Sequence, residues 1–170
     1  NPADVTVTNT DGDIADITVI PVSGLTTTEA ATTATFTVVL DAKPTANVVI
    51  PISSGDTAEV TVSPASLTFT TGNWNVDQTV TLTGVDDAGV IDGDRLVTIA
   101  LAVPSGSADT NFNVIDPADV TVTNTDGNLA GYTVTPTNGL ITSESGTQNT
   151  FTVVLDAKPT ADVIFDVNSG

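Results

Sequence analysis

The chain has 170 residues, three basic side chains against 21 acidic ones, and a formal net charge of −18. This balance excludes nucleic acid and anionic membrane surfaces as partners, since both require a basic face, and it leaves multivalent cations as natural partners. Cysteine is absent, which excludes disulfides and thiolate metal sites, and no apolar run reaches the roughly 18 residues that a membrane-spanning helix needs.

Threonine and valine dominate the sequence, and their branched side chains suit a pleated sheet better than a helix. Apolar and polar residues alternate in several segments, as at Val97, Ile99 and Leu101, which indicates strands with one buried face. Turn residues separate these segments at the spacing of a β-sandwich. The sequence therefore predicts an all-β, immunoglobulin-like antiparallel sandwich, with strands at 17–21, 33–40, 47–53, 59–62, 66–70, 78–85, 95–103 and 119–124.

A tandem duplication organises the chain. NPADVTVTNTDG at 1–12 recurs as DPADVTVTNTDG at 116–127, and FTVVLDAKPTA occurs at 36–46 and again at 151–161. Both pairs are offset by 115 residues, and about 35 of the 55 positions that this offset superposes are identical. The period exceeds that of solenoid repeats and matches one immunoglobulin-sized domain. We therefore expect tandem repeats of 115 residues, each with its own core.

The phase of the repeat divides the chain into three parts. Residues 1–12 are predicted to be the last strand of a preceding repeat, 13–127 a complete repeat, and 128–170 the first strands of the next. First strands alone would expose apolar faces and bare edges, so 128–170 should not fold by itself and should find its partners in further sequence or in another copy. The short linker at 126–130 predicts that successive repeats stack end to end as a rod.

Aspartates are most concentrated in the run GVDDAGVIDGDR, between two predicted strands. Asp86, Asp87, Asp92 and Asp94 repel one another there, and a divalent cation would relieve that repulsion. Calcium takes about 6–8 oxygen ligands in flexible geometry, which suits a loop. The spacing is not that of an EF-hand, and the alternative interpretation is a solvated acidic loop without an ion.

The patterns TTTEAATTATFTVVL, AEVTVSPASLTFTTGN, QTVTLTGVDDAGVIDGDRLVTIAL and DVTVTNTDG together resemble the Calx-β domain, in the tandem form of large bacterial surface proteins. The resemblance covers 13–127 and continues into 128–170. It implies a sandwich that binds calcium at one end, near the exit of the last strand. Because the loop carries Ala88-Gly89 in its middle, we expect one or two ions. By position, the implied calcium ligands are Glu29, Glu59, Asp86, Asp87, Asp92, Asp94 and Asp126.

A few other residues have two interpretations each. Trp74 is a sugar-stacking platform or, by preference, an aromatic that packs a turn. Lys43 and Lys158 lie in identical DAKP turns and are expected to be solvated. Asp11 belongs to the site of a preceding repeat or to a turn, and Glu144 repeats Glu29 in a site that other residues would complete.

The expected function is structural or adhesive: a repeat of a long secreted, extracellular or cell-surface protein that serves as a stalk, an adhesin extender or a filament body. Its expected partners are neighbouring repeats of the same chain or other copies of it, with host or cell-surface ligands elsewhere in the full protein. The alternative is a surface module that binds glycans or proteins through avidity. We do not expect an enzyme, because histidine, cysteine and a glycine-rich phosphate loop are all absent.

Overall fold

A computed structural model describes residues 2–168. Asn1 and the last two residues, which belong to the predicted terminal segments 1–12 and 128–170, lie outside this description. No helix among the described residues is long and apolar enough to cross a membrane. The strands are β1 (Ile17–Ile20), β2 (Leu25–Thr28), β3 (Thr33–Leu40), β4 (Val48–Ser54), β5 (Val60–Ser63), β6 (Ser66–Phe69), β7 (Gln78–Gly84), β8 (Arg95–Leu101), β9 (Val120–Thr125), β10 (Tyr132–Thr135) and β11 (Thr152–Leu155).

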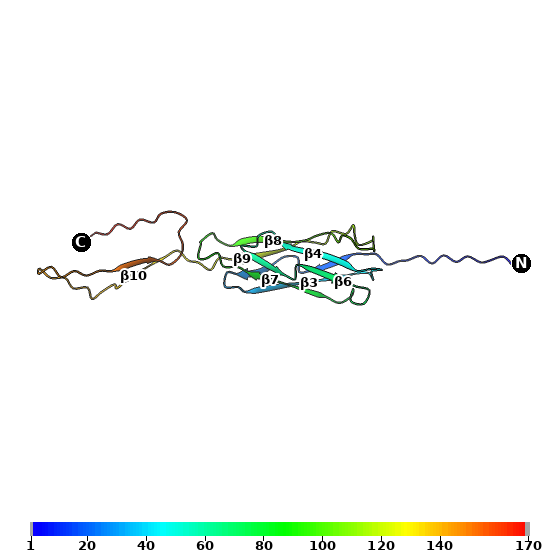
Figure 1. Cartoon of the computed structure of the whole chain (residues 1–170), viewed down its shortest axis with the longest axis horizontal. Coiled ribbons are helices and arrows are strands. Elements are labelled where there is room, and N and C mark those ends of the chain that lie inside the picture. Colours follow the sequence, from blue (N-terminus) through cyan, green and yellow to red (C-terminus); the bar gives the residue numbers. More distant parts are fainter. Residues whose placement is uncertain (1, 169–170) are drawn as a thin grey trace.

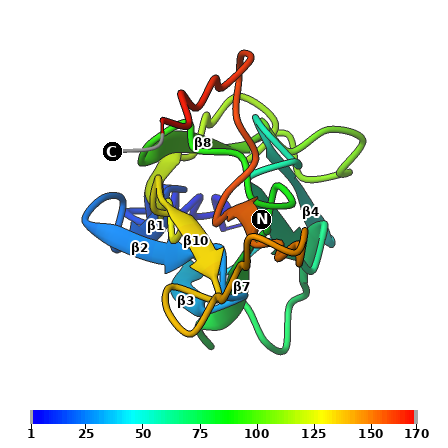
Figure 2. The same cartoon turned by 90° about the vertical axis from the view of Figure 1, so that its left-hand side faces the viewer.

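Strands β1 to β9 form a sandwich of two sheets. One sheet has the strand order β1-β3-β7-β5 and the other has the order β2-β9-β8-β4-β6. Figure 2 looks along the long axis of the molecule and shows β3 and β7 on one side of the sandwich, with β4 and β8 on the other. The predicted all-β sandwich is confirmed, and the boundaries of the eight predicted strands agree with the observed ones to within two residues.

The core lies between the two sheets because successive side chains of a strand point to opposite faces. In β3, Phe36, Val38 and Leu40 face inward and are fully buried, while the threonines and valine between them face outward. In β9, Val120 and Val122 are buried in the same way. Each such side chain contributes roughly 1.5–3 kcal/mol to stability when it is fully buried.

The sequence did not predict β2, and this strand introduces the one parallel pair of the sandwich. Residues Leu25–Thr28 run parallel to β9, with Leu25 opposite Val122 and Thr28 opposite Thr125. Three consecutive threonines give no apolar alternation, which is why the strand was missed. The Thr27 hydroxyl nevertheless faces inward and donates to Asn124 Oδ1 at 3.0 Å, so a polar pair takes the place of an apolar contact.

The described residues nearest the N-terminus and those of the C-terminal hairpin lie at opposite ends of the long axis (Figure 1). Residues 2–12, the N-terminal arm, run in extended conformation away from the sandwich and are exposed throughout. At the other end, β10 and β11 form an antiparallel pair in which Tyr132 lies opposite Leu155. This register repeats that of Ile17 and Leu40 in β1 and β3 at an offset of 115 residues.

The C-terminal segment, residues 128–168, contains counterparts of β1 and β3 only. The repeats of β2, at 140–143, and of β4, within 162–168, form no strand. In the sandwich, β4 pairs with β6 and β8, and no counterpart of either strand exists among the described residues of this segment. The backbone of 162–168 therefore has no ladder to join, since strand formation depends on its hydrogen-bonding neighbours.

Candidate metal centre

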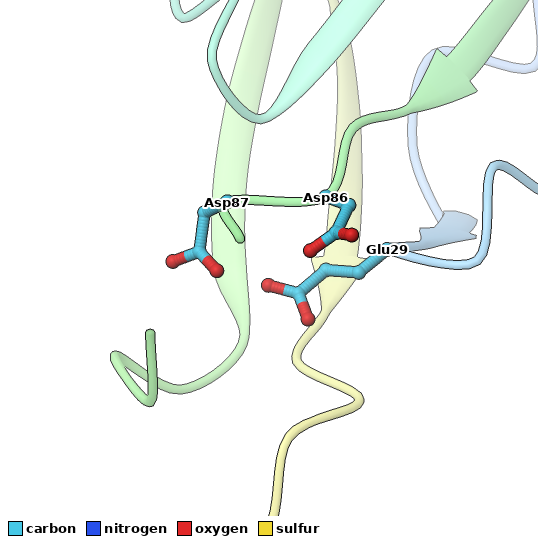
Figure 3. Close-up of side chains that lie close together, drawn as sticks. All are labelled: Glu29, Asp86 and Asp87. Atoms are coloured by element: carbon cyan, nitrogen blue, oxygen red, sulfur yellow. The ribbon is translucent and has the colours of Figure 1, made fainter. Parts of the chain in front are cut away.

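Three carboxylates gather at the end of the sandwich from which the last strand exits. Glu29 follows β2, while Asp86 and Asp87 follow β7 after Val85. Each offers a carboxylate oxygen, and these atoms all lie within 4.8 Å of one another. In Figure 3 the three side chains converge on one small region from two loops. Oxygen donors at this spacing fit a hard divalent cation such as calcium.

The two aspartates also shape the loop that carries them. Asp86 Oδ1 accepts a hydrogen bond from the Ala88 amide at 2.9 Å, and Asp87 Oδ1 accepts one from the Val90 amide at 3.0 Å. Ala88 has a φ of 63°, which is uncommon for a residue with a Cβ, and Gly89 has a φ of 85°. One oxygen of each aspartate is thus engaged by the loop, and its other oxygen is available to a ligand.

Glu29 is the buried member of the group, with 9% of its surface exposed. Its Oε2 atom accepts from the Gly127 amide at 3.1 Å and from Asn128 Nδ2 at 2.7 Å. Burial is the main reason that the pKa of Glu29 is raised, and the charges of Asp87, Asp126 and Asp86 raise it further against the lowering effect of the Gly127 amide. The fold therefore disfavours the ionised form of Glu29, although this form is the one that would bind a cation together with Asp86 and Asp87.

Asp126 and Asp94, two more of the predicted ligands, accept hydrogen bonds from backbone amides at the same end of the sandwich. Asp126 Oδ1 accepts from the Asn128 amide at 2.7 Å, and its Oδ2 accepts from the Gly93 amide at 3.0 Å. These amides lower the pKa of Asp126, so its carboxylate stays ionised. Asp94 Oδ1 in turn accepts from the Asp126 amide at 3.2 Å. Together they tie the loop at 85–94, which we call the acidic loop, to the exit of β9.

Asp92 and Glu59, the last two predicted ligands, form ion pairs with the side chain of Arg95. Arg95 Nε lies 3.5 Å from Asp92 Oδ2 and 3.9 Å from Glu59 Oε1. Glu59 is buried, and its Oε2 also accepts from Asn124 Nδ2 at 3.2 Å. Of the seven predicted residues, the structure thus places Glu29, Asp86 and Asp87 in one cluster, and it gives the other four alternative polar partners.

Sequence reasoning missed the polar residues that hold these acids in place. Asn124 is buried and donates through Nδ2 to both Glu59 and the Val85 carbonyl. The signal was available, because Asn124 continues the inward-facing series of Val120 and Val122. Close packing around Asn124 also explains Gly84, since a Cβ at that position would collide with the Thr28 carbonyl and the Asn124 side chain.

The acidic loop also contacts the C-terminal segment. The Lys158 amide donates to the Gly89 carbonyl at 2.8 Å, and Val90 and Lys158 form an isolated parallel bridge. The Lys158 side chain is exposed, as expected from its turn, so the contact is made by backbone. A groove of about 420 Å³ lies beside it, lined by Ile91 of the acidic loop and by residues of the C-terminal segment that include Tyr132, Leu155 and Phe165.

Trp74 lies in the turn between β6 and β7. It is partly buried and packs against the hydrophobic core, and its carbonyl accepts from the Leu40 amide at 3.1 Å. These contacts favour the interpretation of Trp74 as a turn-packing aromatic over that of a sugar platform.

No family model matches the sequence, and no curated protein gives a significant match. Among solved structures, the chain is similar to the apo form of the Calx CBD1 domain, with 20% identity and a TM-score of 0.49 over 68% of this chain and 100% of that one. It is similar to CBD12 from CALX1.2, with 18% identity and a TM-score of 0.48 over 65% of this chain and 44% of that one. For the E. coli chaperone DraB the values are 11% and 0.46, over 71% and 59% of the two chains. The two-sheet sandwich is established by the strand pairing of the chain itself.

Proposed function

We propose that this chain is a structural or adhesive repeat of an extracellular or cell-surface protein, stiffened by calcium. One observation carries the proposal. The acidic loop supplies Asp86 and Asp87 to the carboxylate cluster, and the same loop accepts the backbone hydrogen bond from Lys158 of the following segment. An ion held by this loop would therefore act on the joint between two parts of the chain.

The donor set of the cluster supports calcium as the ion. Glu29, Asp86 and Asp87 present hard oxygen atoms, with no sulfur or imidazole among them. Their mutual repulsion, which contributes to the raised pKa of Glu29, is relieved when a divalent cation binds. Extracellular calcium modules typically bind with Kd values of about 10⁻⁴–10⁻³ M, which suits a protein that meets calcium outside the cell.

Asp87 connects the proposed ion to the contact between the acidic loop and the C-terminal segment. Its Oδ1 accepts a hydrogen bond from the Val90 amide, and Val90 forms the bridge with Lys158. Without an ion, repulsion among the carboxylates acts on the loop that carries this bridge. We therefore expect successive repeats to be rod-like in calcium and more flexible in a chelator. Rod-like repeats would make the protein long and stiff, which supports a role as a stalk, extender or filament over catalysis.

Hydrogen exchange at two backbone amides tests the proposal. In wild-type protein, the Lys158 amide should be well protected in calcium and should exchange faster in EDTA, because its acceptor Gly89 lies in the acidic loop. The Asp156 amide, which donates to Gly131 at 3.0 Å within the C-terminal segment, serves as the internal control and should exchange equally in both buffers.

An Asp87→Ala variant completes this experiment. It should remove the effect of calcium on the Lys158 amide while leaving the Asp156 amide as it is in the wild type. Equal exchange of the wild-type Lys158 amide in calcium and in EDTA would contradict the proposed link between ion and joint.

A further inference from the structure

The N-terminal arm and the end of the sandwich share one sequence in two different surroundings. Residues 2–12 and residues 117–127 are identical at every position. In the sandwich, Val120 and Val122 of this sequence are completely buried in β9, whereas their counterparts Val5 and Val7 in the arm are each 87% exposed. The arm is thus a strand sequence whose inward-facing side chains have nothing to cover them within the described chain.

The C-terminal segment has the complementary deficiency. Residues 140–143 repeat β2, the strand that pairs with β9, and Leu140 and Ile141 are 41% and 74% exposed. The face of β10 and β11 that corresponds to the core is also open, with Phe151 45% exposed. Phe165 covers part of this face by meeting the Tyr132 ring edge-on, at a centroid separation of 4.9 Å.

We propose that the N-terminal arm of one copy of this chain adds as a strand to the C-terminal segment of a second copy. The register follows from the sandwich, where β2 and β9 run parallel with Leu25 opposite Val122. Shifted by the repeat length, this register places Val7 of one copy opposite Leu140 of the other, with Asn9 opposite Thr142. Strand addition of this kind gains its affinity from main-chain hydrogen bonds and its specificity from alternate side chains.

Side-chain contacts of the sandwich would recur at this joint. The buried pair of Thr27 and Asn124 has its equivalents in Thr142 of one copy and Asn9 of the other. The Gly127 amide, which donates to Glu29 in the sandwich, is repeated by Gly12 of the arm beside Glu144. The polar contacts and the apolar ones thus point to the same register.

Within the described residues, the arm cannot meet the C-terminal segment of its own copy. The arm and the C-terminal segment lie at opposite ends of the long axis and extend away from each other (Figure 1). An arm therefore meets the segment of another copy in a head-to-tail contact, which does not close on itself and extends into a filament. Because every copy carries a net charge of −18, assembly should become stronger as added salt screens the repulsion.

Sedimentation of the 170-residue chain from micromolar to millimolar concentration tests the inference, in calcium and again in EDTA. Wild-type protein should pass from monomer through dimer to longer species in both buffers, because the strand addition does not depend on the ion. The arm variant V5N/V7N should stay monomeric. The matched variant T6N/T8N alters the opposite face of the arm, whose β9 counterparts are only partly buried, and it should assemble as the wild type does.

A mixture of two variants of the 170-residue chain identifies the two surfaces that meet. L140N should also be monomeric alone, because its own segment can no longer accept an arm. Its intact arm can still enter the intact segment of V5N/V7N, so the mixture should form dimers and no longer species. The inference is overturned if wild-type protein remains monomeric, if V5N/V7N assembles as well as wild type, or if the mixture fails to form dimers.

Discussion

Residues 36–46 and 151–161 are identical in sequence, yet the first segment lies in a core and the second lies largely in solvent. Phe36 is 1% exposed and Phe151 is 45% exposed, while the exposed fractions of Val38 and Val153 are 0% and 37%. Both segments form the same hairpin register with the strand before them. Local sequence therefore suffices for the pairing of neighbouring strands, whereas burial requires β7 and the facing sheet.

The same contrast holds for the acids. Glu29 is buried because the exit of β9 covers it with Gly127 and Asn128, and because the acidic loop brings Asp86 and Asp87 beside it. Glu144 occupies the equivalent place in the second copy of the sequence and is exposed. A glutamate in this motif becomes part of a metal centre only when strands distant in sequence close the end of the sandwich.

The largest expected effect on stability comes from replacing the phenylalanine that is buried in the first segment and exposed in the second. Phe36→Ala should lower the free energy of unfolding by about 3–5 kcal/mol, because it removes a buried aromatic side chain and leaves a cavity. Phe151→Ala, in an identical local sequence, should cost less than about 1 kcal/mol, as substitutions at exposed positions do. Urea unfolding followed by circular dichroism measures both. Equal losses would show that the two segments are equally buried in solution.

The next effect concerns the metal. At about 10 mM calcium, a site with a Kd of about 10⁻⁴–10⁻³ M gains roughly 1.4–2.7 kcal/mol of stability over the metal-free protein. Glu29→Gln should remove most of this gain because it withdraws one of the three clustered carboxylates. Glu144→Gln changes the same motif outside the cluster and should keep the full gain. Urea unfolding in calcium and in EDTA compares the three proteins, and a gain that survives Glu29→Gln would remove Glu29 from the site.

Sequence alone predicted most of the fold, because alternation of apolar residues marks each strand that has one buried face. It failed at β2, where a threonine run replaces that alternation and the stabilising partner, Asn124, is distant in sequence. It placed seven acids at one end of the sandwich, but it could not show which of them form one cluster and which have other polar partners. The assignment depended on contacts between residues distant in sequence, which only the folded chain brings together. These are the contacts of Asn124 and Arg95 with Glu59 and of the Gly93 amide with Asp126.

The smallest expected effect uses pH and reverses the sign of the Glu29→Gln substitution. In metal-free protein, the raised pKa of Glu29 means that its ionised form disfavours the fold. This penalty is complete above the raised pKa, and it disappears as the pH falls through that pKa towards the ordinary range of glutamate, about 4.3. In EDTA, Glu29→Gln should therefore be more stable than the wild type at neutral pH, with a margin that shrinks on acidification. The lowered pKa of Asp109 acts in the opposite sense, but it is common to both proteins and cancels in the difference. Asp126 repels the charge of Glu29, so its effect on the difference is part of the same penalty. Glu144→Gln makes the same change at an exposed position of the repeated motif and serves as the control for the substitution itself. Urea midpoints between neutral pH and the glutamate range decide the matter: a Glu29→Gln margin that is constant with pH would mean that burial and the neighbouring carboxylates do not disfavour the charge of Glu29.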